Sequence, residues 1–116
     1  MPKRKEEPAF AGSNILLILA LLEDEDKYGY QIIRELECRS DKTFSMKEGT
    51  LYPILHGLEE RGEVRSYERE SEAGRRRRYY KLTRQGVKTL ARCRQEWQAF
   101  CRQFGKVVGG EACVVL

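Results

Sequence analysis

Two apolar segments open the chain. Every residue from 15 to 22 is apolar, and by periodicity such a run fits a buried strand or a buried helix. The preceding Gly12-Ser13-Asn14 offers an N-cap, and the leucines and the alanine favour a helix at the centre of a small bundle. After a polar break at 23–26, the segment from Tyr28 to Arg39 has apolar residues three and four apart, which indicates a second helix with one buried face.

A third helix is predicted around four apolar residues on one face: Leu51, Ile54, Leu55 and Leu58. Gly62 is its C-cap, and its first turn is expected close to Pro53, because proline is tolerated only near a helix start. The opposite face carries small, aromatic or polar side chains with few charges: Thr50, Tyr52, Pro53, His56 and Gly57. An ordinary solvated face would carry more lysine and glutamate, so this face is a candidate binding surface.

Period-two alternation replaces the helical pattern after Gly62. The segment from Val64 to Glu68 alternates, residues 70–74 form a glycine-bearing loop, and residues 75–83 alternate again, which predicts a β-hairpin. Residues 75–84 hold six basic side chains and no acid, while the remaining 16 basic and 18 acidic side chains leave a net charge of −2. Charge focused on one hairpin is typical of a phosphate-binding surface; the alternative is a basic strand that only keeps the protein soluble.

A final helix is predicted from Thr83 to about Phe104. Its apolar residues form a short coiled-coil-like seam, interrupted by Arg94, which either faces solvent or pairs across a dimer. Twenty residues of helix are about 30 Å long, and no other segment is left to cover the seam, so a second copy of the chain is its simplest cover. The predicted dimer interface comprises Leu90, Cys93, Trp97, Phe100, Cys101 and Phe104.

Length and composition limit the fold to one small domain. The 116 residues are 41% apolar and 34% charged, too apolar for a disordered chain and too few for a barrel or a doubly wound sheet. The predicted fold is mainly α with a β-hairpin, a winged helix-turn-helix with one long C-terminal dimerisation helix. We expect a flexible arm (1–11), a winged-helix DNA-binding domain (12–83), the dimerisation helix (84–105) and a flexible tail (106–116).

Other chemistries find little support. The four cysteines lack close ligand pairs and there is one histidine, so we expect ordinary thiols, no metal site, no disulfide framework and no cofactor. No P-loop, dinucleotide-binding loop or catalytic constellation is found, which argues against an enzyme. The longest apolar run has eight residues, too few to cross a membrane, and the charged start lacks a signal-peptide pattern, so we expect a cytoplasmic protein. The last four residues match a prenylation pattern without a preceding basic cluster, and we interpret them as part of the tail.

Three motifs, in this order, resemble the PadR family of transcriptional regulators. They are Tyr28-Gly29-Tyr30; the segment 48–53 (Glu-Gly-Thr-Leu-Tyr-Pro) with Leu55 and Leu58-Glu59; and Gly74-Arg75-Arg76-Arg77 with Tyr79-Tyr80, Leu82-Thr83 and Gly86. The resemblance covers about residues 13–98, and the single C-terminal helix is similar to the small subfamily. It implies a prokaryotic repressor that binds an inverted-repeat operator as a homodimer and responds to small hydrophobic or phenolic compounds.

The resemblance also implies roles for individual residues. On the third helix, two residues fall where family members approach DNA and two lie beside them on the helical wheel, while the arginines match the family's wing. The predicted DNA contacts are Lys47, Thr50, Tyr52, His56, Arg75, Arg76 and Arg77. Trp97 falls where family members carry a tryptophan at the dimer centre, so it is a candidate ligand contact, with a plain dimer-core role as the alternative.

The sequence therefore predicts a regulator that binds double-stranded DNA sequence-specifically, as a homodimer, with a small hydrophobic molecule as its effector. The alternative is a winged-helix protein-interaction adaptor without specific DNA binding, which would use the weakly charged face of the third helix to bind a protein.

Overall fold

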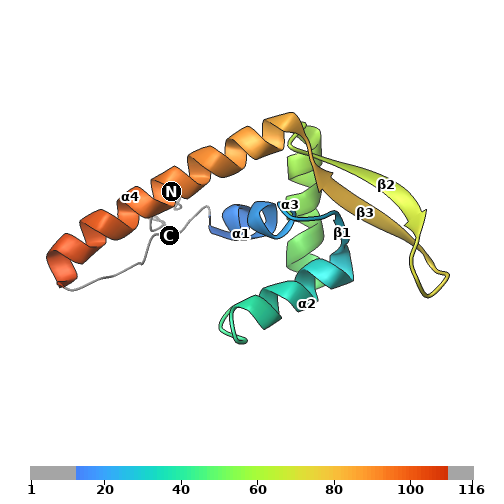
Figure 1. The fold of residues 1–116 in the computed structure, drawn as a ribbon, viewed down its shortest axis with the longest axis horizontal. Helices are drawn as coiled ribbons and strands as arrows, with labels where there is room; N and C mark the ends of the chain where they lie inside the picture. Colours follow the sequence, from blue (N-terminus) through green and yellow to red (C-terminus); the bar gives the residue numbers. More distant parts are fainter. Residues whose placement is uncertain (1–12, 110–116) are drawn as a thin grey trace.

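The structure, a computed structural model, describes residues 13–109 and confirms the predicted winged helix-turn-helix fold. A central body carries two projections, a long helix and a two-stranded hairpin (Figure 1). The predicted arm at residues 1–11 and the end of the predicted tail lie outside the described residues. The elements in chain order are α1 (Ser13–Leu21), β1 (Lys27–Tyr28), α2 (Gly29–Arg39), α3 (Glu48–Glu60), β2 (Val64–Glu70), β3 (Arg76–Leu82) and α4 (Arg84–Val108).

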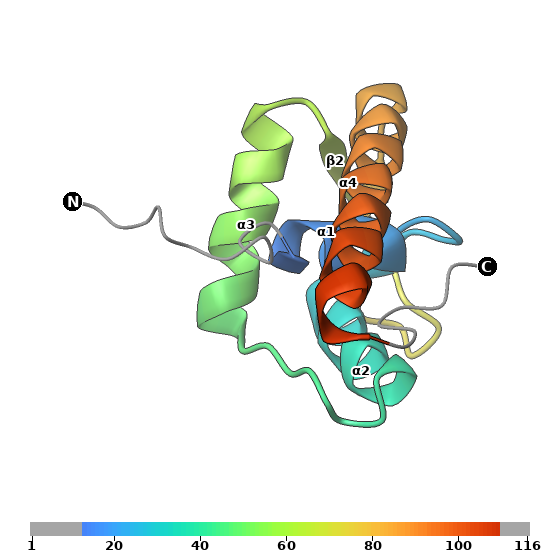
Figure 2. The ribbon, with the colours of Figure 1, turned by 90° about the vertical axis from the view of Figure 1, so that its left-hand side faces the viewer.

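α1 lies in the middle of the molecule, and Figure 2 shows it between α3 and α4. Ile18 and Leu19 of this helix are fully buried, in one core with the leucines of α3 and with Leu90 of α4. A helix with neighbours on several sides needs apolar residues all round, which explains the unbroken run from 15 to 22. The preference for a helix over a strand in this run is confirmed.

The sheet has the order β1-β3-β2 with antiparallel neighbours. The sequence did not predict β1, because a strand of two residues gives no period-two signal and its first residue is a lysine. Lys27 is nevertheless fully buried: its ammonium donates to the carbonyl of Leu21, at the end of α1, at 2.7 Å and to Asp24 at 2.8 Å. The buried charge is thereby paired, and it complements the negative end of the α1 dipole.

α3 begins earlier than predicted. Its first backbone hydrogen bonds run from Thr50 and Leu51 to the carbonyl of Lys47, so Pro53 lies in the second turn. A proline there removes one hydrogen bond from the helix. Leu51 and Leu55 are both fully buried, and their packing holds the helix together across that gap. The expected position of the first turn is therefore wrong by about one turn.

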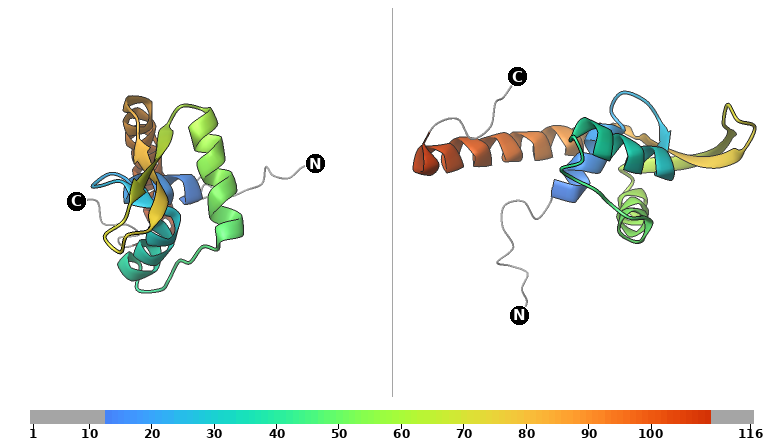
Figure 3. Two further views of the ribbon diagram at one scale, coloured as in Figure 1. Left: turned by 90° about the vertical axis from the view of Figure 1, so that its right-hand side faces the viewer. Right: turned by 90° about the horizontal axis from the view of Figure 1, so that it is seen from below.

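A close junction ties the start of α4 to the turn between α3 and β2. The hydroxyl of Thr83 accepts from the amide of Gly86 at 3.0 Å and donates to the carbonyl of Gly62 at 2.6 Å. The buried carboxylate of Glu63 accepts from Thr89 at 2.9 Å. A Cβ on Gly86 would overlap the carbonyl oxygen of Glu63, so this approach requires glycine. The junction sets the direction in which α4 leaves the body, away from the hairpin (Figure 3).

The expectation that the cysteines are ordinary thiols is wrong at one position. Cys38 and Cys93 are free thiols, whereas Cys101 is disulfide-bonded, so the expectation of ordinary thiols is wrong for Cys101. Spacing along the chain carries no information on which distant cysteines meet. Within residues 13–109, no group of His, Cys, Asp and Glu side chains could hold a metal ion, and no helix has the length and apolar character to cross a membrane.

Candidate nucleic-acid interface

The outer face of α3 has different chemistry at its two ends. Its leucines turn into the core, and the outside exposes three of the predicted DNA contacts: Lys47, Thr50 and His56. Glu48 is exposed in the first turn, and Glu59 and Glu60 are exposed together at the C-terminal end. The paired glutamates would repel a polyanion, so a nucleic acid would meet the N-terminal half of α3. This is the half that contacts base edges in helix-turn-helix proteins.

Tyr52 differs from the other predicted contacts on α3 because it is half-buried. Its hydroxyl and the adjoining ring carbon occupy the space that a Cβ on Gly29 would fill. Burial raises the pKa of the Tyr52 hydroxyl, nearby Glu48 raises that pKa further, and Arg77 opposes both. The glycine of the Tyr-Gly-Tyr motif thus makes room for the tyrosine of the α3 motif. Tyr52 joins α3 to the start of α2.

The wing, which we define as β2, β3 and the loop 71–75, pairs arginines with glutamates on one face. Glu68 lies opposite Arg78 in the β2–β3 register, accepts from Arg76 at 3.2 Å and is 3.8 Å from Arg78. Residues 64–82 hold seven basic and three acidic side chains, so the wing keeps a positive surplus. The wing's surplus is smaller than that of residues 75–84 because the wing includes Glu72 and excludes Arg84, while the two arginines and two glutamates of β2 cancel. Arg75 and Arg76 are exposed near the tip of the wing.

Arg77 packs on aromatic rings rather than on glutamate. Its guanidinium lies 4.4 Å from the centroid of the Tyr28 ring, and its Nε is buried without a hydrogen-bond partner among residues 13–109. Arg69 lies 4.0 Å from the centroid of Tyr79, which meets Tyr28 edge to face at 5.3 Å. Stacking restricts both guanidinium groups and links the wing to the start of α2. Sequence reasoning missed Arg69; its alternation with Tyr67 was the signal that could have found it.

The predicted dimer residues of α4 differ in exposure. Two of them, Leu90 and Cys101, are buried within the chain. The others are partly exposed or exposed: Cys93, Trp97, Phe100 and Phe104. The helix continues three residues past the predicted end at 105, and its last two residues, Val107 and Val108, are exposed as well. The far end of α4 therefore carries an exposed apolar surface that is longer than predicted.

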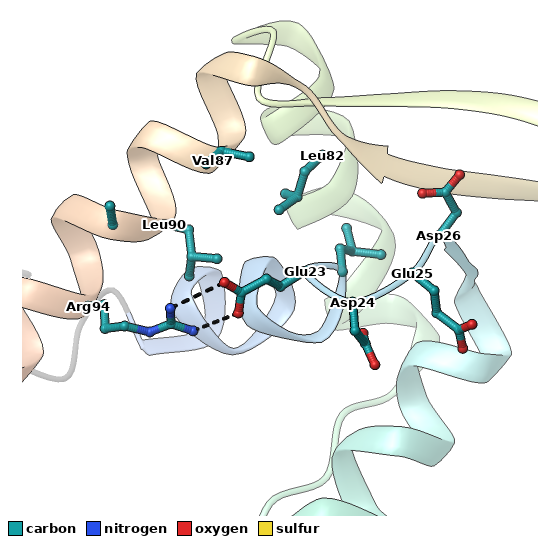
Figure 4. A pocket seen from close by; sticks show the side chains of 10 residues that line it. Glu23, Asp24, Glu25, Asp26, Leu82, Val87, Leu90 and Arg94 are labelled. Carbon is teal, nitrogen blue, oxygen red and sulfur yellow. Dashed lines mark hydrogen bonds and ion pairs between the residues drawn. The ribbon is translucent and has the colours of Figure 1, made fainter. Parts of the chain in front are cut away.

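The side chain of Arg94 forms an ion pair within its own chain. Its guanidinium donates to both carboxylate oxygens of Glu23, at 3.0 and 3.4 Å (Figure 4). These hydrogen bonds hold the pKa of Glu23 below its ordinary value. The pair connects the α1–β1 loop to α4 within one chain; the Arg94 side chain is also 42% exposed, and its pairing across a dimer stays a prediction. Spacing on a helix cannot show that a loop residue 71 positions away faces it.

The geometry defines a class of protein: a winged helix-turn-helix, with α2 and α3 as the two helices and the wing beside them. Comparison with known proteins narrows the class. A model of the transcriptional regulator PadR-like family matches residues 18–92, and the chain belongs to this family. It is a DNA-binding transcriptional regulator and not an enzyme, as the sequence predicts.

Three relatives show the extent of the likeness. An uncharacterized protein of Lysinibacillus sphaericus is 35% identical over 81 residues, which are 70% of this chain and 74% of that protein. The crystal structure of a PadR family transcription regulator from Clostridium difficile is 35% identical, with a TM-score of 0.70 over 81% of this chain and 96% of its own. A transcriptional regulator from Clostridium thermocellum is 32% identical, with a TM-score of 0.72 over 84% and 92%.

Proposed function

We propose that the protein is a cytoplasmic repressor that binds an inverted-repeat operator as a homodimer. The observation that carries this proposal is the weakly charged N-terminal half of α3 beside a wing with a positive surplus (Figure 3). α3 enters the major groove with Lys47 at its N-cap and Thr50 in its first turn toward the base edges, and with His56, in its C-terminal half, further along the groove, because their donors and acceptors suit direct readout. Arg75 and Arg76 follow the phosphate backbone, which carries no sequence information but sets affinity and register.

Two of the predicted DNA contacts, Tyr52 and Arg77, lie next to the start of α2. Tyr52 and Arg77 are half-buried, and each is restrained by a residue of the Tyr-Gly-Tyr motif. We assign their exposed edges to phosphate contacts, and their buried parts to holding α3 and the wing at a fixed distance. Fixed spacing matters because two readout elements must meet the same duplex at once.

The far end of α4 supports the dimer. Phe104, Val107 and Val108 are 49%, 88% and 62% exposed, an unusual concentration of apolar surface on one helix end. Isologous packing of two α4 helices buries the same surface twice, with Cys93, Trp97 and Phe100 along the contact. The two α3 helices then lie on either side of the axis, and half-sites about one helical turn apart follow.

The proposed effector is a small hydrophobic or phenolic molecule that binds beside Trp97 and releases the operator. The indole is half-buried on α4, where a ligand that separates the helices would change its surroundings. Quenching of Trp97 fluorescence by such compounds, together with loss of DNA affinity, is the expected result. Quenching with unchanged DNA affinity would contradict the regulatory role.

Affinity selection from sheared genomic DNA of the source organism tests the proposed function. Purified protein is mixed with fragments at near-physiological salt, and the bound pool is sequenced. We expect enrichment of one inverted repeat upstream of a gene whose transcription the protein lowers. Uniform recovery of fragments would contradict specific binding and favour an adaptor that retains only electrostatic affinity for DNA.

A further inference from the structure

A cavity of about 330 Å³ lies between the α1–β1 loop and the first turns of α4 (Figure 4). Its floor is apolar and comes from three elements: Leu22, Leu82, Val87, Leu90 and Ala91. Val87 remains 55% exposed there, which is high for an apolar residue beside the core. The volume and the apolar floor are those of a small-molecule site, which typically measures about 300–1,000 Å³. Trp97 does not line this cavity.

The wall of the cavity is negatively charged. It consists of the acidic loop, residues 23–26, with four consecutive carboxylates, and of Arg94 as the one cation among the lining residues. Arg94 is already bound to Glu23 through two hydrogen bonds. Figure 4 shows the carboxylate of Glu23 beside the apolar floor, whereas those of Asp24 and Glu25 point away from it, so a positively charged group on a ligand would meet Glu23 in competition with Arg94.

Each of three carboxylates in the acidic loop is bound to a different part of the molecule. Glu23 is bound to α4 through Arg94. Asp24 accepts from Arg39 at the end of α2 at 3.1 Å, in addition to Lys27 of β1. Asp26 accepts from the hydroxyl of Tyr67 in the wing at 2.5 Å. The acidic loop thus connects the proposed dimerisation helix to α2 and to the wing.

We propose that this cavity is an effector site for a small organic cation with an apolar body. The apolar body rests on the floor between Leu82, Val87 and Leu90, and the ammonium group lies against the carboxylate of Glu23. Occupancy draws Glu23 away from Arg94 and loosens the link between α4 and the DNA-binding elements. The regulatory half of this proposal rests on the proposed DNA-binding function; the binding half does not, and it differs from the Trp97 site in both place and charge.

Three probes with one apolar body test the binding half by calorimetry on the full chain: tert-butylbenzylamine, tert-butylbenzyl alcohol and tert-butylbenzoate, which are a cation, a neutral molecule and an anion at neutral pH. The amine should bind about tenfold more tightly than the alcohol, because charge-assisted hydrogen bonds are the stronger ones, and the benzoate should bind least. Equal affinity for the three probes, or no binding of the amine, would overturn the proposal.

Matched variants locate the site. Glu23→Gln, at an exposed position, should weaken binding of the amine about threefold. Glu96→Gln is the control: it removes a carboxylate from α4 whose partner is Arg92 and which does not line the cavity. Val87→Lys places a cation over the floor and should abolish amine binding. Equal effects of Glu23→Gln and Glu96→Gln would contradict the site. Loss of the dimer in Val87→Lys would show a second copy as the occupant, and would also contradict it.

Measurements of DNA affinity test the proposed coupling between the cavity and the DNA-binding elements. Saturating amine should weaken binding to a selected operator, and Arg94→Gln should reproduce that loss without ligand. Arg92→Gln is the control, since the ion pair of Arg92 within residues 13–109 runs along α4, to Glu96 at 3.5 Å. If the unliganded protein fails to bind any operator, the proposed function fails. If it binds and the amine leaves the affinity unchanged, this coupling fails while the proposed function stands.

Discussion

At the scale of single residues, two glycines set the distances between the DNA-binding elements. Gly29 accommodates the ring of Tyr52 between α2 and α3, and Gly86 lets the first turn of α4 approach the carbonyl of Glu63. The two contacts differ in kind, because a side chain such as Tyr52 can move and a backbone carbonyl inside a junction cannot. That difference leads to two separate expectations for alanine substitutions.

Gly29→Ala should destabilise the protein by about 1–3 kcal/mol, because the new Cβ forces Tyr52 out of its place. Urea denaturation measures the free energy of unfolding. Tyr52→Ala removes the obstruction, so in the Gly29→Ala background it should cost clearly less than in the native chain. Strictly additive losses would contradict the contact between these two residues.

Gly86→Ala should cost more, at or above the upper end of the same range of about 1–3 kcal/mol, because its Cβ meets backbone that cannot rotate away. Gly49→Ala is the matched control. It too is a helical glycine, but a Cβ there has nothing within 4 Å, so the substitution should be neutral or add up to about 1 kcal/mol of stability. Thermal or urea unfolding of both variants makes the comparison, and equal losses would refute the close junction.

The roles of these residues show the limit of sequence reasoning at this scale. Lys47, Thr50 and His56 could be placed on an exposed face because a helical wheel predicts which side of α3 leaves the core. The half-buried positions of Tyr52 and Arg77 could not be predicted in this way, because the residues that cover them, Gly29 and Tyr28, belong to other elements. Spacing along the chain does not reveal contacts between elements, because these contacts form only in the tertiary structure.

At the scale of elements, the wing combines a charged tip with an aromatic base. Arg75 is exposed at the tip, Arg76 shares Glu68 with Arg78, and Arg69 and Arg77 stack on tyrosines. The arginines are therefore not equivalent, and a change in the salt dependence of DNA binding is expected to differ among them.

Arg75→Ala should reduce the slope of log affinity against log salt by roughly 1, the value for one lost phosphate contact. Arg76→Ala should reduce that slope by less, because Glu68 already offsets part of its charge at 3.2 Å. Glu68→Gln should raise DNA affinity, and Arg92→Ala, on the part of α4 away from the wing, should leave the slope unchanged. Fluorescence anisotropy across a salt series gives these slopes. A slope unaffected by Arg75→Ala would argue against phosphate contact at the tip.

Elements with a strong period were predictable, and those without one were not. The amphipathic α2 and the hairpin follow from apolar spacing, whereas the unbroken apolar run of α1 was assigned to a helix from its N-cap, its leucines and its alanine. β1 could not be predicted, because its two residues are positioned by pairing with β3 and by the buried charge of Lys27. The start of α3 was wrong because packing of Leu51 and Leu55 outweighs the hydrogen bond that Pro53 removes.

At the scale of the whole molecule, α3 and the wing lie at one end of a body 51 Å long, and α4 extends toward the other (Figure 1). Association through the far end of α4 leaves both DNA-binding ends free. One chain would then supply one half-site, and two chains would supply the pair. Stability of the dimer and affinity for DNA are accordingly expected to fall together when the end of α4 is changed.

Phe104→Glu should weaken the dimer and DNA binding together, because it places a charge in the proposed apolar contact. Phe104 is 49% exposed in the single chain, so the fold itself should tolerate the change. Gln95→Glu adds the same charge at an exposed position on the opposite side of α4 and should have little effect. Sedimentation equilibrium measures the dimer. A Phe104→Glu protein with an unchanged dimer would contradict the role of this end of α4.

A hydroxyl-radical footprint of the protein on a selected operator tests the central claim most directly, because it reports where the backbone is covered on each strand. The account predicts two protected windows about one helical turn apart, related by a two-fold axis, each with a shoulder that disappears in Arg75→Ala. A single protected window, or uniform weak protection along the fragment, would contradict the proposal that two copies of α3 and two wings bind the operator together.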